Sequence, residues 1–421
     1  MTEERLIISR KTNNKFFLMI AVGVVLLIAG IILMATGGGG EHHAEGGEQA
    51  AVEHAATWLD RLWVNLWLNN VYFTGIALIG VFFVAVNYVT YSGWYTLIKR
   101  VPEALGYFLP VGGVIMLLVF LFGSHTIFHW THEYLYEIDD PRYDPIIAGK
   151  RPYLNTVFFL IRMVAYFALW IGLATWLRKN SVKEDLEGGT DYYHKNIRIS
   201  AVFLVVFGVT SSTAAWDWVL SIDTHWFSTM FGWYVFSSWW VSGLAAVTLA
   251  VIFLKQNGYL KMVNANHLHD LGKFCFAFSI FWTYIWFSQF MLYWYANIPE
   301  EAIYFIERTN ARGYDFNWIF FGNLFINFFF PFLVLMTRDA KRQMIMLKIV
   351  TIAILIGHWF DFYLMIMPGT LRGEASVGLM EIGTALVFLG VFLLMFTKGL
   401  TKAALVPVNH PFLEESVHHH V

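Results

Sequence analysis

His358 and Asp361 stand close together in the apolar stretch AILIGHWFDFYLMIMPG (353–369). Residues three apart share one face of a helix. A charge at the centre of a lipid bilayer costs about 2.5–3.5 kcal/mol on insertion scales. We therefore expect this face to turn into the protein, where a partner, a water-filled cavity or a function offsets the cost.

Other ionisable residues lie in further apolar stretches, toward one side of the membrane. Asp217 comes just after a run of hydroxyl residues (210–213), and His125 lies in the segment GSHTIFHW with two further histidines close behind it. Arg162 is expected near the middle of its stretch, and Glu381 lies near the start of the last stretch. The set of candidate proton-transfer residues is His358, Asp361, Asp217, His125, Arg162 and Glu381.

Four chemical interpretations of this set stay open. A haem would need axial histidines, for which His125 and His358 are candidates. His125 and His129 have metal-ligand spacing but lack a third ligand at a sensible position. Arg162 could form a structural ion pair with Asp217 or Asp361. The interpretation we favour is a proton-conducting or quinol-facing pocket open to the outside, because intramembrane acids are typical of proton relays and histidine titrates near neutral pH.

The composition indicates a membrane protein. Of 421 residues, 57% are hydrophobic and only 14% are charged, whereas soluble domains contain about 25% charged residues. The net charge of −2 and the lack of a basic patch interleaved with aromatics argue against nucleic-acid binding. The single cysteine, Cys275, excludes an internal disulfide and a cysteine-ligated cluster, and no C-x-x-C-H motif for c-type haem is present.

Apolar runs of about 20 residues predict membrane-spanning helices. The predicted fold is an all-α polytopic membrane protein with ten transmembrane helices, in which spans 2–5 (68–221) and 6–9 (229–368) form two four-helix bundles flanked by spans 1 and 10. Residues 1–67 are expected to contain a retained anchor helix, a Gly-rich acidic linker (37–49) and an interfacial helix (57–67). Residues 376–421 are expected to contain the tenth span and a tail whose HHH run is disordered. The predicted spans are 16–36, 68–91, 105–127, 153–177, 198–221, 229–254, 271–295, 316–337, 344–368 and 376–398.

Lysine and arginine predict the orientation of the chain, because cytoplasmic loops are enriched in them. Twenty of the 28 basic residues fall on the side of the N-terminus, and Arg162 lies inside a span. We therefore expect both termini on the cytoplasmic side of the membrane. The seven on the opposite side are Arg61, Arg142, Lys150, Arg151, Arg308, Arg312 and Arg372.

Three motifs in order carry a resemblance to a known family. They are AAWDWVLSIDTHWFSTMFGWYVF (214–236), LGKFCFAFSIFWTYIWFSQFMLYWYANIPEE (271–301) and GHWFDFYLMIMP (357–368). The chain resembles, over its whole length, the ActF subunits of bacterial alternative complex III, which belong to the wider NrfD and polysulfide reductase C type of membrane protein.

The resemblance implies a subunit of a quinol:cytochrome c oxidoreductase in a respiratory electron transfer chain. Its implied partners are the ActC paralogue, ActB with iron–sulfur clusters, ActA and ActE with haem c, and a terminal oxidase. The substrate of such a complex is menaquinol or another quinol, and this chain itself would hold no redox cofactor and would offer a candidate proton path. The inner halves of the predicted spans lack acids and histidines, which favours an outer half-channel over a complete relay. Alternatives are a quinol-oxidising anchor that uses Asp217, His125 and Arg162, and a purely structural scaffold.

Overall fold

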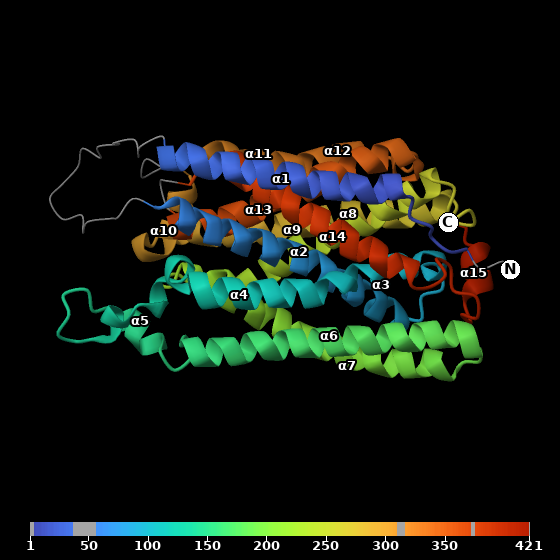
Figure 1. The fold of residues 1–421 in the computed structure, drawn as a ribbon, viewed down its shortest axis with the longest axis horizontal. Helices are drawn as coiled ribbons and strands as arrows, with labels where there is room; N and C mark the ends of the chain where they lie inside the picture. Colours follow the sequence, from blue (N-terminus) through green and yellow to red (C-terminus); the bar gives the residue numbers. More distant parts are fainter. Residues whose placement is uncertain (1–3, 37–55, 310–315, 372–374, 421) are drawn as a thin grey trace.

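The computed structural model describes residues 4–36, 56–309, 316–371 and 375–420, so the expected linker at 37–49 lies outside the described residues. Within these ranges the chain forms helices and no strand, and ten helices are long and apolar enough to cross a membrane. The protein is an all-α polytopic membrane protein, as predicted (Figure 1). The spans are α1 (Arg10–Thr36), α2 (Trp58–Val89), a third running through α3 (Arg100–Leu105) and α4 (Leu109–Ile127), α6 (Thr156–Glu187), α7 (Asp191–Trp218), α8 (Phe231–Gln256), α9 (Ala265–Ala296), α11 (Asn317–Leu324) with α12 (Phe330–Val334), α13 (Met344–Leu371) and α14 (Leu379–Thr401).

Short helical elements complete the chain at the two ends of the molecule. The end that carries both termini, called the terminal end below, also holds α15 (Leu413–Val417) (Figure 1). The opposite end, called the loop end, holds α5 (Pro145–Lys150) and α10 (Pro299–Arg308) (Figure 1). The shorter turns are η1 (Thr96–Ile98), η2 (Gly106–Phe108), η3 (His129–Thr131), η4 (Glu133–Tyr136), η5 (Leu220–Ile222), the π turn η6 (Phe325–Phe329) and η7 (Ala340–Arg342).

The helices pack as two four-helix bundles, as the sequence predicted. Helices α2, α4, α6 and α7 form the first bundle, and α8, α9, α11–α12 and α13 form the second. Helix α2 lies at the junction, where it also packs against α8 and α13 of the second bundle. Two hydrogen bonds join α2 to α13: the Tyr72 hydroxyl donates to the Leu355 carbonyl over 2.7 Å, and the Trp359 indole donates to Asn69 over 2.9 Å.

Small residues allow the two bundles to approach closely. A Cβ atom at Gly75 of α2 would come within 1.9 Å of the Trp239 ring on α8. A Cβ atom at Gly243 of α8 would come within 2.1 Å of the Ile79 side chain on α2. Close backbone approach at small residues is the main way in which helices associate in a membrane, so these glycines fix the α2–α8 contact.

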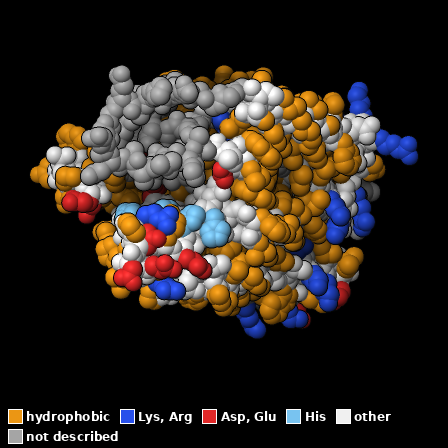
Figure 2. Space-filling model, turned by 60° about the vertical axis from the view of Figure 1, so that its left-hand side comes forward, with side chains coloured by type: hydrophobic (Ala, Val, Ile, Leu, Met, Phe, Trp, Pro, Cys, Tyr) orange, Lys and Arg blue, Asp and Glu red, His pale blue; other side chains and the backbone are white. Residues whose placement is uncertain are grey.

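Helices α1 and α14 flank the bundles as a pair, which agrees with the predicted position of spans 1 and 10. Only 11% of the apolar window of α1 is buried in the protein, so most of its surface faces outward. Glycine again forms the contact, because a Cβ atom at Gly23 would come within 2.8 Å of the Gly383 carbonyl oxygen. Figure 2 shows the corresponding belt of hydrophobic side chains, with Lys and Arg side chains gathered away from the loop end.

Three expectations about particular segments were wrong. Residues 57–67 do not form a separate interfacial helix but the first turns of α2, because Thr57 and Asp60 form a capping box at its start and Val64 and Trp67 are buried. Helix α6 continues about ten residues beyond the predicted span, so Arg162 lies two turns from its loop end rather than near its middle. The C-terminal tail is docked: His419 lies 2.6 Å from Asp270.

Candidate functional site

The carboxylate of Asp361 is the centre of a buried polar site inside the second bundle, where four side chains donate hydrogen bonds to it. Its side chain is fully buried. The Tyr234 hydroxyl and the Asn323 amide donate to Oδ1 over 2.5 and 2.8 Å, and the Ser238 hydroxyl and the Trp282 indole donate to Oδ2 over 2.6 and 2.9 Å. All four donors are neutral. A buried carboxylate thus has its lone pairs occupied by groups from each of the other three helices of the bundle.

His358 lies beside this carboxylate on the same face of α13, as the spacing predicted. Its Nδ1 atom is 3.6 Å from Oδ2 of Asp361, which is within ion-pair range but too long for a good hydrogen bond. The imidazole is fully buried and meets the Trp282 ring edge to face at 5.3 Å. Neither ring nitrogen has a hydrogen-bond partner among the described residues. Such an orphaned buried polar group requires an explanation, and a role in proton transfer is one.

The eighth span bends to bring its amides to this site. Pro331 has no N–H, and its ring would clash with the carbonyl of Asn327 four residues earlier in a regular helix. The π turn η6 (Phe325–Phe329) widens the helix at that carbonyl. Asn327 then donates to Asn323, which in turn donates to Asp361. Gly357 of α13 permits this approach, because a Cβ atom there would come within 2.1 Å of the Asn327 side-chain oxygen.

The arrangement around Asp361 can hold a proton or a negative charge. If His358 is protonated, it forms an ion pair with Asp361; if it is neutral, four neutral donors still hold the carboxylate. About 14 residues separate His358 from the start of α13, which places it roughly 21 Å along the helix and near its middle. A titratable pair at that depth, without a fixed cation, has the chemistry of a proton-transfer step.

Asp217 of the first bundle is also a buried carboxylate, and its partner is a fixed cation. Arg162 donates to both oxygens of Asp217, from Nε to Oδ2 over 2.8 Å and from Nη2 to Oδ1 over 2.9 Å. The Tyr166 hydroxyl adds a third donor at 3.1 Å. This bidentate pair matches one of the two ion pairings considered from the sequence; the carboxylate that Arg162 binds is that of Asp217, not that of Asp361.

Tyr153 contacts the Arg162–Asp217 pair on the side of the loop end. Its ring lies 4.0 Å from the Arg162 guanidinium, and its carbonyl accepts from Arg162 over 3.0 Å. Burial and the neighbouring charge of Asp217 raise the pKa of the Tyr153 hydroxyl. A cavity of about 240 Å³ lies beyond it, lined by Lys150, Tyr153 and Trp216 among others. That volume is below the roughly 300–1,000 Å³ of most small-molecule pockets.

Glu381 lies in a third polar site, separate from those of Asp361 and Asp217. Its buried carboxylate accepts from Arg61 through two hydrogen bonds of 2.7 and 2.8 Å, from Asn65 over 2.8 Å, and from the backbone N–H of Gly378 over 2.8 Å. These contacts join the start of α14 to the start of α2. With a guanidinium fixed on both of its oxygens, Glu381 is positioned as a structural anchor for the flanking pair rather than as a member of the Asp361 site.

His125 lies at the surface of the loop end, and no contact in the structure joins it to Asp217 or Arg162. Its ring is 5.2 Å from that of His132, which in turn is 5.8 Å from that of His129. Burial lowers the pKa of His132, and the nearby His125 lowers it further. Figure 2 shows histidine side chains beside acidic side chains at this end. Among the described residues, no group of three His, Cys, Asp or Glu side chains has metal-site geometry.

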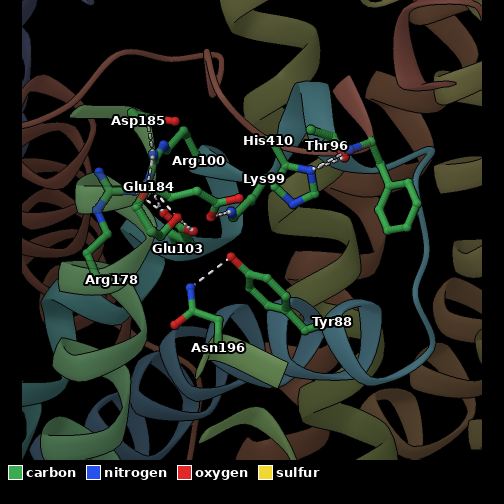
Figure 3. Close-up of polar contacts among 12 residues, drawn as sticks. Tyr88, Thr96, Lys99, Arg100, Glu103, Arg178, Glu184, Asp185, Asn196 and His410 are labelled. Carbon is green, nitrogen blue, oxygen red and sulfur yellow. Dashed lines mark hydrogen bonds and ion pairs between the residues drawn. The ribbon is translucent and has the colours of Figure 1, made fainter. Parts of the chain in front are cut away.

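A cluster of buried charges at the terminal end was missed from the sequence (Figure 3). Lys99 and Glu184 pair at 3.5 Å, Arg100 donates to Glu103 over 2.8 Å, and Arg178 also pairs with Glu103. All five side chains are almost completely buried. The signal was helical spacing: Arg100 and Glu103 are three apart, as are residues 178, 181 and 184, so each set shares a face.

No family model matches the sequence, and a search of curated proteins finds no match either. The structural features that bear on function are therefore the ten-span fold and the Asp361 site.

Proposed function

We propose that this chain is an integral membrane subunit of a bacterial quinol:cytochrome c oxidoreductase of the alternative complex III type. In this role the chain contributes to assembly and carries out proton transfer, while haem c and iron–sulfur clusters reside in partner subunits. It would lie in the inner membrane with both termini in the cytoplasm. Support comes from the three sequence motifs, which fall on α7–α8, α9 and α13 of the described structure.

The observation that carries the proton-transfer role is the state of the His358–Asp361 pair. A purely structural ion pair is expected to have its polar atoms satisfied, as Arg162 and Asp217 do. His358 instead has two orphaned nitrogens next to a carboxylate held by neutral donors alone. The proposed role of Asp361 is to exchange a proton with His358, and the role of Tyr234 and Asn323 is to orient the carboxylate.

A structural role is the second candidate for part of the molecule. The Arg162–Asp217 pair and the Arg61–Glu381 pair each join two helices through two charge-assisted hydrogen bonds. We assign these two pairs to assembly. The third candidate, quinol oxidation by Asp217, His125 and Arg162, has less support, because Arg162 already occupies both oxygens of Asp217 and His125 lies apart.

The membership of the chain in such a complex can be tested by purification. The full-length chain, tagged and expressed in its own bacterium, would be extracted in mild detergent and isolated. We expect co-purification of subunits with haem c and iron–sulfur spectra, together with quinol:cytochrome c reductase activity. Two results together would contradict the proposal. The chain would purify without partner subunits, and a strain that lacks its gene would keep its quinol:cytochrome c reductase activity.

A further inference from the structure

A cavity of about 540 Å³ opens between helices at the terminal end of the first bundle. Its walls are apolar and come from three spans: Val81 and Val84 of α2, Tyr107 and Pro110 at the η2–α4 junction, and Ile171 of α6. Pro110 is exposed, so the cavity reaches the outer surface of the bundle. A volume of this size lies within the range of pockets that hold small organic ligands.

Three lysines line the polar part of this cavity. Lys179 and Lys183 are one turn apart on α6 and are exposed, and Lys402 caps the C-terminal end of α14. In the described part of the chain, the lysines that form ion pairs are Lys99 and Lys273, not these three. Lys402 and Lys183 instead lie over the rings of Tyr107 and Tyr192, at 5.0 and 5.8 Å. The polar rim therefore carries uncompensated positive charge.

Three acidic side chains in or near the cavity form ion pairs with other basic residues. Glu103 lines the cavity but accepts from Arg100, Arg178 and the Ser181 hydroxyl. Glu184 pairs with Lys99, and Asp185 pairs with Arg100 (Figure 3). The negative charge of Glu103 is therefore already balanced by two arginines, and it does not offset the charge of the three lysines. The cavity thus has apolar walls and a positively charged rim. This combination is complementary to an anionic amphiphile.

We propose that this cavity binds an anionic membrane phospholipid. The phosphate would lie against Lys179, Lys183 and Lys402, and an acyl chain would fill the apolar walls formed by α2 and α6. Basic pockets between spans on the positively charged side of a membrane protein bind lipid head groups by this charge matching. A quinone is a poorer match, because its neutral head group gains nothing from three lysines.

The test measures lipid retention by the purified full-length chain with native mass spectrometry. The probes are phosphatidylglycerol and phosphatidylcholine with identical acyl chains. We expect selective retention of phosphatidylglycerol, and binding roughly 100-fold weaker in the triple variant K179Q/K183Q/K402Q, from the usual contribution of a lysine to anionic-lipid binding. The matched control K11Q/K15Q/K261Q removes three exposed lysines from the same end of the chain and should bind like the wild type.

Two further arms separate the alternatives. Thr175→Trp fills the cavity from an exposed lining position without a change of charge and should also weaken binding. Glycerol 3-phosphate has the charge but no acyl chain and should not displace the lipid. The proposal would be overturned by equal retention of the two lipids or by equal binding to the triple variant and its control. Displacement of the lipid by glycerol 3-phosphate, or by menaquinone at matched concentration, would also overturn it, as would full binding by Thr175→Trp. Thermal unfolding of each variant confirms that it is folded.

Discussion

The imidazole Nδ1 of His358 lies 3.6 Å from a carboxylate oxygen of Asp361, in a place where both side chains are fully shielded from solvent. In the other bundle, Arg162 holds Asp217 through two short hydrogen bonds. The fourth helix of each bundle therefore presents one buried acid, but only the acid of the second bundle has a histidine beside it. This difference in partner is the reason for assigning proton transfer to one site and assembly to the other.

Neutralising Asp217 should lower the stability of the folded protein more than it changes proton transfer. Asp217→Asn leaves the Arg162 guanidinium buried without its counter-charge, and removal of one partner of a buried pair costs about 3–5 kcal/mol. We expect a lower yield of folded protein and a lower unfolding temperature in detergent. The double variant R162Q/D217N should recover part of this loss. A double variant no more stable than Asp217→Asn would contradict the assignment of the pair to assembly.

The orientation of the chain can be tested with two matched single-cysteine variants. Ile7 and Ile138 are 80% and 78% exposed and lie at opposite ends of the molecule, and the native Cys275 is buried. In intact spheroplasts, an impermeant thiol reagent should label I138C and should label I7C only after the membrane is permeabilised. The reverse pattern would invert the topology predicted from the basic residues.

The contact of the C-terminal segment should weaken in acid because of His410. Burial, and then the positive charge of Lys99, lower the pKa of this histidine from 6.5 to about 2. Its Nδ1 accepts from the backbone N–H of Phe412 over 3.2 Å, which needs the neutral ring. The released segment binds a proton below pH 6.5 while the docked segment does not, so docking is strongest above that pH and weakens as the pH falls toward 2.

Hydrogen exchange of residues 405–417, corrected for intrinsic rates, measures this effect at pH 7.5 and pH 5. We expect faster corrected exchange at pH 5 in the wild type. His410→Asn keeps an acceptor in place but does not titrate, so its exchange should change less between the two conditions than that of the wild type. An equal pH response in the two proteins would show that another group controls docking.

The number and positions of the ten spans were predictable because burial in lipid demands long apolar runs. The contact of Arg162 with Asp217 was one of two alternatives, since sequence alone does not show which helices are neighbours. The donors to Asp361 were not predictable: Tyr234, Ser238 and Trp282 are ordinary residues of apolar helices until bundle packing brings them together.

The charged cluster at the terminal end was missed for a different reason. Hydropathy ends a span where charged residues begin, but α6 and α7 continue into this region and turn at Gly188 and Gly189, both with positive φ. Lys99 and Glu184 are buried there by pairing. A scan for opposite charges at helical spacing beyond the predicted span ends would have identified the extension.

We propose that Asp361 carries protons, and the most direct measurement of this role is proton release by the assembled complex. Asp361→Asn keeps the volume of the side chain but cannot titrate, whereas Ser238→Ala removes one hydrogen bond to the same carboxylate and leaves it titratable. In proteoliposomes containing the complex, a quinol pulse with cytochrome c as acceptor gives protons released per electron from a pH-sensitive dye. We expect an assembled Asp361→Asn complex with reduced turnover or reduced proton release, and a Ser238→Ala complex with the wild-type ratio of protons to electrons. Wild-type turnover and proton release in an assembled Asp361→Asn complex would contradict it.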